Sequence, residues 1–422
     1  MYISADHHEC TPTLFPKPHT LTALLLSLVL LVALLLYLPS SFTPPQQGLI
    51  AVTCFFLLYS AFQFRDTIFQ RPHPVLWRVV KGISLLYLLT LIYLLFQPIS
   101  YSRELMKYTD PSVGVPLEER SYATDCRIYT PNHPDGPFAN VWATINDEFV
   151  LAHVIGWWAK MIMFRDFWLA NLLSVLFEFT EYSFQHVLEN FKECWFDHWI
   201  IDVLVCNLIG IWLGSITCEY LSFPRQNWFK QYAEVSSPKK VINQLGPFSF
   251  KVFKWPVFTS PLRFFSMSLL LVIALLIEIN CFFLKTVLWL PPMSPFNTVR
   301  LLFWWLWGTP GLAEFYQFLI NPNHRLGDQA WISFALAFVE CLFWVVHGGY
   351  LFKRVHTPTY IPLLWIGGWL LCLGFAVSKW VQKGGQKDIE VTQVKEIPQD
   401  KENLPEPFVK KDKIPRTPLI HS

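Results

Sequence analysis

Long hydrophobic runs separated by short polar segments dominate the chain between residues 20 and 382. An α-helix needs roughly 20 consecutive apolar residues to cross a bilayer core that is about 30 Å thick. Runs of this length therefore predict membrane-spanning helices. Ten spans are expected, at 20–39, 47–65, 80–98, 149–165, 167–188, 199–221, 265–288, 298–320, 329–352 and 359–382.

Two of these runs are joined by almost no connecting chain. Only Arg165 and Asp166 stand between the fourth and the fifth run, which predicts a tight helical hairpin. An even number of spans places both termini on one side of the membrane. The segment 1–19 precedes the first span, and the tail 383–422, rich in Lys, Glu, Asp and Pro, is expected to be disordered and solvated. The prediction is an all-α, polytopic membrane helix bundle over 20–382.

Composition supports the membrane interpretation and excludes several functions. The chain of 422 residues is 53% hydrophobic and 15% charged, whereas soluble domains carry about 25% charged residues. A net charge of +2 gives no reason to expect a nucleic-acid partner. The motifs GxxxxGK[ST], HExxH and GxSxG are absent, as is the pattern of CDP-alcohol phosphotransferases, so neither ATP, zinc proteolysis nor a CDP-activated lipid is indicated.

Lys and Arg residues are distributed unequally between the two sides of the predicted bundle. With a cytosolic N-terminus, the cytosolic side receives Lys160, Arg165 and the basic loop 222–264. Because cytosolic loops of membrane proteins carry the excess of Lys and Arg, this bias favours cytosolic termini. The segments 99–148 and 189–198 then lie on the lumenal or exterior side.

Each of those two segments contains one cysteine, Cys126 in the first and Cys194 in the second. In an oxidising compartment the two thiols can pair. The sequence leaves a disulfide and two free thiols equally open.

Negative charge is concentrated in one stretch, "FEFTEYSFQHVLENFKECWFD", at residues 177–197. Ionisable side chains at membrane depth are costly, and they are usually functional. Glu178 and Glu181 are three residues apart, so they share one face of the fifth predicted helix, among apolar neighbours. Glu189 is expected to be an ordinary surface residue.

More polar groups follow at the start of the sixth predicted helix. Glu193 and Asp197 share a face if that helix begins early, whereas Asp202 and Asn207 need a bend or a second site. Neighbouring carboxylates repel one another unless a cation lies among them. Oxygen ligands favour a hard cation, and Ca²⁺ fits better than Mg²⁺ because it takes more protein oxygens. The candidate metal ligands are Glu178, Glu181, Glu193, Asp197 and Asp202.

His153 lies one turn into the fourth predicted helix, in "DEFVLAHVIGWW". A lone histidine on an apolar helix is more often a packing residue than a catalyst. Here the hairpin returns the carboxylates of the fifth helix to the same side and depth, so His153 can act beside a cation as a general base. His186 and His198 are weaker candidates because of their aromatic and loop settings.

Four stretches together resemble the phosphatidylserine synthases of the base-exchange type: "AHVIGWWAK", "FEFTEYSFQHVLENFKECWFDHWIIDVLVCNLIGIWLG", "RPHPVLWR" and "EINCFFLK". The resemblance runs from about Lys17 to the end of the last span, and "DHWIIDVLVCN" and "PFANVW" are more similar to the type 2, ethanolamine-exchanging branch. It implies a multi-pass protein of the endoplasmic reticulum membrane with a catalytic domain at 20–382 and an active site facing the lumen. The implied reaction is a Ca²⁺-dependent exchange of a phospholipid head group for L-serine, without a nucleotide. The donor is phosphatidylethanolamine or phosphatidylcholine, with ethanolamine favoured.

The resemblance also implies roles for single residues. The catalytic residues carried over by position are His153, Glu178 and Asp197. The substrate-binding residues are Arg71, Asn190, Asn207 and Glu278. Arg71 is equally well explained as a positive anchor before a helix, and Glu278 as a buried structural group. The sequence departs from the family at Ala313, where an arginine is typical, so any contact of that arginine with lipid or serine must be compensated or be weaker here.

A different class of function uses the same carboxylates. A cation-coupled transporter or lipid scramblase also places acids inside the membrane, although no inverted repeat or pair of broken helices is visible in this sequence. A hydrolase that releases head groups is a third interpretation. The sequence leaves open whether the chain forms a homodimer, and whether His153 acts as a base or as a covalent nucleophile.

Overall fold

The computed structural model describes residues 18–395, except 40, 70, 108–109, 118–120, 222–252, 292–293, 322–323 and 354. The chain divides into two compact units, residues 1–367 and 368–422. The predicted N-terminal segment up to residue 17, most of the basic loop 222–264 and the tail beyond residue 395 lie outside the described residues.

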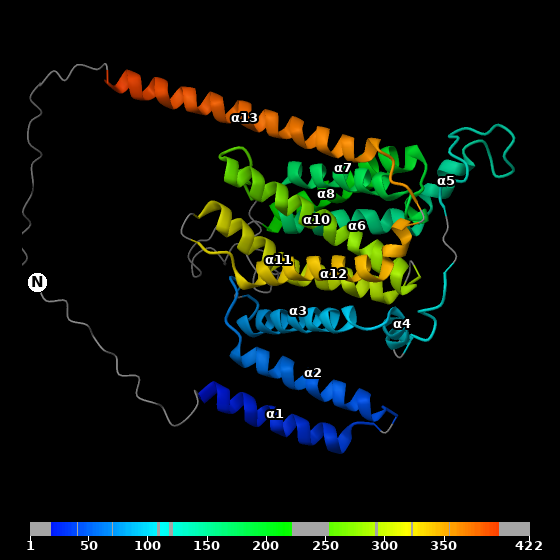
Figure 1. The fold of residues 1–422 in the computed structure, drawn as a ribbon, viewed down its shortest axis with the longest axis vertical. Coiled ribbons are helices and arrows are strands. Elements are labelled where there is room, and N and C mark those ends of the chain that lie inside the picture. Colours follow the sequence, from blue (N-terminus) through cyan, green and yellow to red (C-terminus); the bar gives the residue numbers. More distant parts are fainter. Residues whose placement is uncertain are drawn as a thin grey trace, which may run out of the picture. The chain divides into compact units, whose positions relative to one another are not determined.

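The first three long helices pack in sequence order. They are α1 (Pro18–Tyr37), α2 (Pro44–Gln63) and α3 (Pro74–Leu95), and α2 packs against both of its neighbours (Figure 1). Proline at the first positions of α2 and α3 suits a helix start, because its missing N–H would have no partner there. The imidazole of His73 caps α3 by accepting a hydrogen bond from the Val75 N–H at 3.2 Å.

Two antiparallel helices form the predicted hairpin, α6 (Glu148–Phe164) and α7 (Phe167–Phe184). Each begins with an aspartate cap: Asp147 accepts from the Phe149 N–H at 3.1 Å, and Asp166 accepts from the Leu169 N–H at 2.9 Å. Between the helices, Arg165 adopts a left-handed conformation with φ of 52°, which reverses the chain within two residues. The hairpin prediction is confirmed.

The next span consists of two kinds of helix. A π-helical segment, η2 (Asp197–Asn207), continues directly into α8 (Leu208–Leu221). Gly210 and Gly214 let α8 approach α6 closely. A Cβ atom on Gly210 would contact the Val154 carbonyl oxygen, and one on Gly214 would lie 2.7 Å from the Met161 Cβ. Small residues four apart are a common way for membrane helices to pack backbone to backbone.

The remaining long helices are α10 (Pro261–Leu288), α11 (Pro295–Ile320), α12 (Asp328–Lys353) and α13 (Tyr360–Lys395). The shorter elements are α4 (Ile99–Lys107), α5 (Ala139–Ile145) and η1 (Glu189–Phe191). α13 continues past residue 382, where the tenth span was expected to end.

A buried ion pair ties several of these helices together. Arg300 of α11 contacts the carboxylate of Glu340 of α12 at 2.5 Å, and Glu340 is fully buried. The same carboxylate accepts hydrogen bonds from Tyr87 of α3 at 2.7 Å and from Asn280 of α10 at 3.2 Å. These partners compensate a charge pair that would otherwise be costly in an apolar interior.

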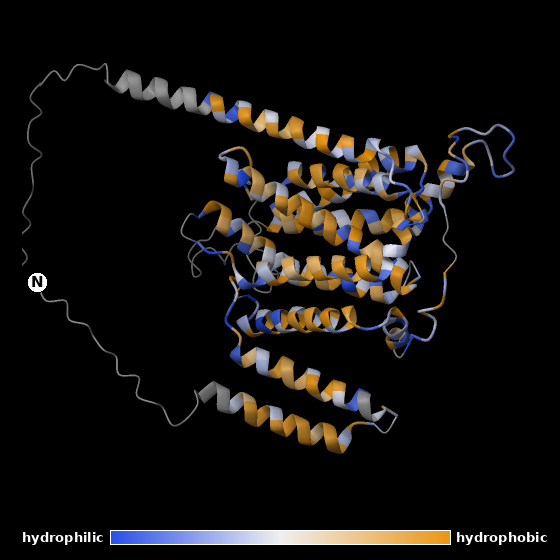
Figure 2. Cartoon of the chain, viewed as in Figure 1, coloured by the Kyte–Doolittle hydropathy of each residue, from blue (hydrophilic) through white to orange (hydrophobic). Residues whose placement is uncertain are grey.

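Each of the ten predicted spans overlaps a helix, and the described residues contain no strand. Hydrophobic residues dominate these helices, and polar residues gather in the connecting segments, including the loop before α5 (Figure 2). Within the part of the chain that the structure describes, five helices are long and apolar enough to cross a membrane: Pro74–Leu95, Asp197–Leu221, Pro261–Leu288, Asp328–Lys353 and Tyr360–Gln382. The all-α membrane fold is therefore confirmed, whereas the number of ten spans stays a prediction.

Candidate active site

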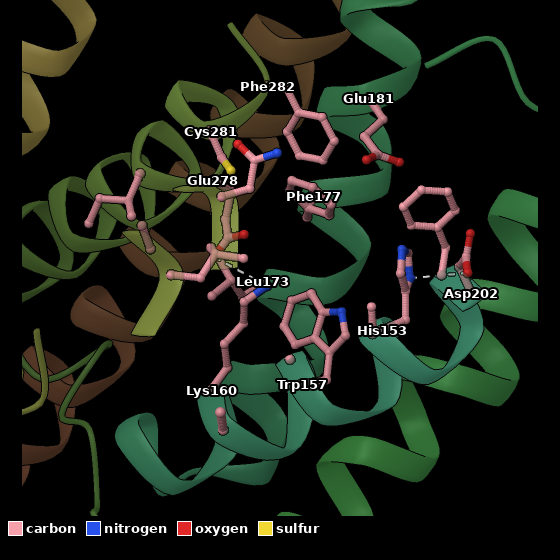
Figure 3. Close-up of a pocket in the computed structure, with 18 of the residues that line it drawn as sticks. His153, Trp157, Lys160, Leu173, Phe177, Glu181, Asp202, Glu278, Cys281 and Phe282 are labelled. Carbon is pink, nitrogen blue, oxygen red and sulfur yellow. Dashed lines mark ion pairs between the residues drawn. The ribbon is translucent and has the colours of Figure 1, made fainter. Parts of the chain in front are cut away.

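A cavity of about 670 Å³ opens among α6, α7, α10 and α11. Its lining is polar at the end where α6 begins, with Tyr122, Asn140 and Thr144, and mainly apolar deeper between the helices, with Leu270 and Phe315 among others. Figure 3 shows His153, Trp157 and Lys160 along the α6 wall. A polar mouth leading to an apolar chamber suits a ligand with a polar head and an apolar tail.

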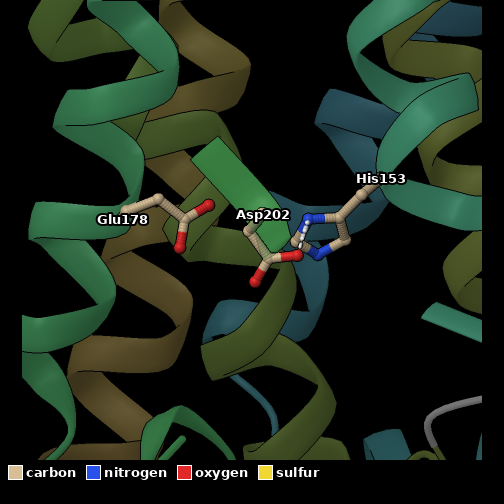
Figure 4. Close-up of side chains that lie close together, drawn as sticks. All are labelled: His153, Glu178 and Asp202. Atoms are coloured by element: carbon tan, nitrogen blue, oxygen red, sulfur yellow. Dashed lines mark ion pairs between the residues drawn. The ribbon is translucent and has the colours of Figure 1, made fainter. Parts of the chain in front are cut away.

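His153 and Asp202 form an ion pair at this polar end. The His153 Nδ1 lies 3.1 Å from the Asp202 Oδ1, as the dashed line in Figure 4 marks. The His153 side chain is 26% exposed and that of Asp202 only 9%. A carboxylate on Nδ1 fixes the ring and leaves Nε2 as the atom that can exchange a proton with a ligand. His153 also lines the cavity.

Glu178 lies at the centre of a buried polar cluster. Its carboxylate is fully buried and lies 3.2 Å from the His198 Nδ1, and it accepts a hydrogen bond from the Asn207 amide, also at 3.2 Å. Asn207 donates in addition to the Ser174 hydroxyl at 3.0 Å. Ser174 and Glu178 are one turn apart on α7, so a single face of this helix supplies both groups.

Two further acids surround the same imidazole. The Glu181 and Glu193 carboxylates lie 3.8 and 3.7 Å from the His198 Nδ1. Glu193 lies in the segment between α7 and η2, outside the membrane-spanning helices. Burial raises the pKa of its carboxyl to about 8, while the positive charge of His198 opposes the shift and nearby carboxylates add to it. The cluster therefore holds more acidic groups than one imidazolium can neutralise.

The π-helix explains how Asp197, Asp202 and Asn207 come to serve one site. In an α-helix, residues five apart lie about 140° apart around the axis. Hydrogen bonds between residues five apart, as in a π-helix, bring such residues close to one face. Asp197 and Asp202 both line the cavity, and Asn207 contacts Glu178. The sequence predicted a bend or a second site for Asp202 and Asn207, and the structure shows a change of helix type there.

Among the described residues, two groups of side chains could hold a metal ion: His153, Glu178 and Asp202, and Glu178, Glu181 and His198. Within each group the possible ligand atoms lie within 4.8 Å of one another, and Glu178 belongs to both. Two buried atoms of these side chains make no hydrogen bond, the His198 Nε2 and the His153 Nδ1, and the latter has only its ion-pair contact with Asp202. The Oδ1 of Asn207, beside Glu178, likewise accepts no hydrogen bond. The donor set is mostly carboxylate oxygen and thus fits a hard cation.

A disulfide holds the loop before α5 against this site. Cys126 and Cys194 are bonded, with their Cα atoms 5.1 Å apart. Next to the bond, the Tyr122 N–H donates to the Lys192 carbonyl at 2.9 Å. The alternative of two free thiols is therefore excluded in this structure. Tyr122 and Cys194 both line the cavity, so the disulfide shapes its mouth.

The other predicted substrate-binding residues divide into two groups. Asn190 and Glu278 line the cavity, and Glu278 pairs with Lys160 at 3.2 Å. Arg71 is not among the lining residues. It is exposed just before α3, where its carbonyl accepts a hydrogen bond from the Trp77 indole at 2.7 Å. The structure therefore does not bring Arg71 to the other candidate residues.

The structure also places three further residues singled out in the sequence: Glu189, Ala313 and Lys160. Glu189 is 40% exposed and pairs with Lys192, as expected for a surface residue. Ala313 packs in an apolar cluster with Trp304 and Leu336. Lys160, which the sequence assigned to the cytosolic side, lies inside α6 on the cavity wall.

His198 is the main residue that sequence reasoning undervalued. It is 4% exposed and contacts the central Glu178. The available signal was its position directly after Asp197, but a loop setting was assumed there. Only the helical geometry of η2 turns His198 toward α7.

Comparisons with known proteins agree on one family. The sequence model described as "Phosphatidyl serine synthase" matches residues 72–348. The chain is 39% identical to CDP-diacylglycerol--serine O-phosphatidyltransferase 2 of Oryza sativa, over 83% of this chain and 85% of the relative. It is 38% identical to phosphatidylserine synthase 2 of Homo sapiens, over 89% of this chain and 79% of the relative. A third relative, CDP-diacylglycerol--serine O-phosphatidyltransferase 1 of Arabidopsis thaliana, is 37% identical over 81% of each chain.

Proposed function

The chain belongs to the phosphatidyl serine synthase family, and we propose that it makes phosphatidylserine by exchanging the head group of a membrane phospholipid for L-serine. The observation that carries this proposal is the His153–Asp202 pair beside the buried Glu178 cluster, at the polar end of a largely apolar cavity. Phosphatidylethanolamine is the favoured donor, in line with the relatives named phosphatidylserine synthase 2 and the sequence motifs shared with the ethanolamine-exchanging branch.

The exchange replaces one phosphodiester by another, so it needs no nucleotide. The serine hydroxyl oxygen forms a bond to phosphorus, and the bond from phosphorus to the ethanolamine oxygen breaks. His153, held by Asp202, removes the proton from the serine hydroxyl and returns a proton to the leaving alcohol. A free hydroxyl attacks an anionic phosphorus slowly, and this proton transfer removes part of the barrier.

The proposed cofactor is Ca²⁺, because the available ligands are mostly buried carboxylates that repel one another without a cation. Glu178, Glu181 and Asp202 would hold it, together with Glu193 and Asp197 at the edge of the cavity. When bound, Ca²⁺ supplies positive charge that neutralises the phosphate oxygens.

The proposed location is the endoplasmic reticulum membrane, with the site on the lumenal side and both termini in the cytosol. The Cys126–Cys194 disulfide supports this sidedness, because such bonds persist in oxidising compartments. The disulfide lies at the end of the helices from which His153 and the acidic cluster are reached.

CDP-diacylglycerol is the second candidate for the lipid donor, and the names of two relatives favour it. The relatives from Oryza sativa and Arabidopsis thaliana are named as CDP-diacylglycerol--serine O-phosphatidyltransferases. With CDP-diacylglycerol as donor, the leaving group would be CMP rather than ethanolamine. Against this donor, the sequence lacks the motif by which CDP-alcohol phosphotransferases hold their nucleotide.

The experiment uses the purified full chain in liposomes with labelled L-serine. Phosphatidylethanolamine, phosphatidylcholine and CDP-diacylglycerol are supplied in separate arms, each with Ca²⁺ or with a chelator. We expect Ca²⁺-dependent labelled lipid and released ethanolamine in the first arm, and neither product from His153→Ala. Labelled lipid only with CDP-diacylglycerol would overturn base exchange. Entry of serine without new lipid would identify a transporter, and phosphatidic acid formed without serine would identify a hydrolase.

A further inference from the structure

An ion pair crosses the cavity at a distance from the proposed reaction centre. Lys160 stands on the α6 wall and Glu278 on the α10 wall, and the Lys160 Nζ lies 3.2 Å from the Glu278 Oε1. The two side chains are 19% and 20% exposed. In Figure 3 the pair lies on one side of Trp157, and His153 with Asp202 lies on the other. The proposed proton transfer and the acidic cluster do not use this pair.

The surroundings make this pair costly as a purely structural contact. Leu173 and Phe282, which lie beside the pair in Figure 3, offer no polar side-chain atom to either charge, and polar groups such as Asn190 and Lys285 line other parts of the same cavity. The Lys160 ammonium gains contact with the aromatic faces of Trp157 at 4.1 Å and Phe177 at 5.3 Å. A partly desolvated ion pair contributes little net stability, so a role in ligand binding explains its position better.

We propose that Lys160 and Glu278 form the subsite for a zwitterionic amino acid, with Lys160 binding the α-carboxylate of L-serine and Glu278 binding its α-ammonium. This inference rests on the proposed function, since serine is the co-substrate of head-group exchange. The serine molecule lies between the two side chains. Its carboxylate replaces Glu278 as the partner of Lys160, and its ammonium replaces Lys160 as the partner of Glu278.

The balance of charges gives this subsite its selectivity. A zwitterion placed between Lys160 and Glu278 leaves every charge paired, because one negative and one positive group enter together. Ethanolamine and choline are cations without a carboxylate, so either one satisfies Glu278 and leaves Lys160 unpaired in an apolar cavity. An unpaired charge there is strongly disfavoured. The subsite therefore accepts serine as the entering alcohol and expels the leaving amine.

The spacing along α6 directs the serine hydroxyl toward His153. Side chains of a helix lean toward its N-terminus, so Lys160 reaches back to the level of Trp157, as its contact with that ring shows. Trp157 is four residues after His153, a rise of about 6 Å. A molecule of the size of serine spans this distance. Its hydroxyl then points to the imidazole while its carboxylate stays on Lys160.

The first test measures binding without turnover. Labelled L-serine is bound to the purified full chain in nanodiscs that lack an exchangeable donor, and competitors are added. L-Alanine, a zwitterion without the hydroxyl, should compete, whereas ethanolamine should not. Lys160→Met should weaken serine binding on the order of tenfold or more, as expected for loss of a charge-assisted contact. Competition by ethanolamine equal to that by L-alanine would overturn the subsite.

The second test separates ligand binding from a merely structural ion pair. The double variant Lys160→Glu with Glu278→Lys keeps an ion pair between α6 and α10 but reverses its polarity. We expect it to fold and to lose serine binding, while Lys160→Arg retains binding. Serine binding by the reversed pair at the wild-type level would refute the proposal.

Kinetics distinguish a failure of this inference from a failure of the proposed function. If exchange occurs and the subsite is correct, Lys160→Met raises the KM for serine and leaves the KM for the phospholipid unchanged. Active exchange in which both constants stay at their wild-type values overturns the subsite alone. Serine binding that depends on Lys160 in a chain without exchange activity overturns the proposed reaction and retains the subsite.

Discussion

Asp202 differs from the other carboxylates of the cluster because it pairs with His153. The sequence placed it among the metal ligands, whereas the structure brings its Oδ1 to 3.1 Å from the His153 Nδ1. Figure 4 shows Asp202 between His153 and Glu178. It can therefore hold the imidazole, share a cation with Glu178, or do both. These roles respond differently to the concentration of Ca²⁺.

Asp202→Asn should lower the rate of serine exchange by about 10²–10⁴-fold, the range that a general base contributes. The reason is that an amide cannot stabilise the imidazolium as a carboxylate does. Incorporation of labelled serine measures the rate, with Glu189→Gln as an exposed control that should remain active. If excess Ca²⁺ restores the activity of Asp202→Asn, the role of Asp202 is that of a cation ligand and not that of a positioning residue for His153.

His198→Leu should destabilise the chain by about 1–3 kcal/mol, because it removes the Nδ1 contact of a fully buried Glu178. His198→Gln keeps a polar side chain that can donate, and it should lose less. Thermal unfolding in detergent compares the two variants. Equal midpoints for wild type and His198→Leu would show that Glu178 does not depend on this imidazole for stability.

At the residue scale, the sequence predicted the acids better than it predicted their partners. Glu178 and Glu181 could be placed on one helix face because their spacing is local and apolar neighbours flank them. The contacts of His198 and Lys160 depend on how separate helices face one another. No local pattern encodes that arrangement, so both residues were undervalued.

The closely packed pair α6 and α8 sets the register of the site at the scale of elements. α6 carries His153, while η2, which continues into α8, carries Asp202. Gly210 and Gly214 allow the backbones of the two helices to lie in close contact, because a Cβ atom at either position would clash with α6. A shift of α8 along α6 therefore changes the distance between the histidine and its carboxylate.

Gly210→Val should lower both stability and exchange activity. The new side chain would contact the Val154 carbonyl and lie within about 3 Å of Trp157, and overpacking of this kind costs about 1–3 kcal/mol. Gly48→Ala is a matched control, since nothing lies within 4 Å of a Cβ atom at that helical glycine. Thermal unfolding and serine incorporation are measured on both. Wild-type values for Gly210→Val would contradict the role given to this contact.

Helix positions followed from hydrophobic length, and the hairpin followed from the two residues between its helices. The π-helical hydrogen bonding of η2 could not be predicted from the sequence, because a membrane helix is expected to have the 3.6-residue period of an α-helix. An α-helical period separates Asp197, Asp202 and Asn207 around the helix axis, whereas the π-helical geometry of η2 brings them toward one site. The least regular element is thus the one that assembles the candidate site.

For the whole molecule, the disulfide joins segments 68 residues apart in the sequence. It borders the polar mouth of the cavity and links the loop before α5 to the segment before η2. Cross-links that close long loops stabilise a fold mainly by restricting the unfolded chain.

Cys126→Ser should lower the free energy of unfolding by roughly 2–4 kcal/mol and should abolish the mobility shift between reduced and non-reduced samples. Cys372→Ser, at an exposed free cysteine, is the control and should change neither property. Electrophoresis and thermal unfolding report the two effects. An unchanged shift in Cys126→Ser would contradict the bond.

The buried Arg300–Glu340 pair has a consequence for how the protein is made. Arg300 lies on α11 and Glu340 on α12, so a ribosome delivers the positive charge first. An isolated arginine in hydrocarbon costs several kcal/mol. Until α12 is made, the Arg300 guanidinium lacks its carboxylate partner, which favours holding α11 in contact with water or with the insertion machinery. We therefore expect α11 and α12 to enter the bilayer together rather than one after the other.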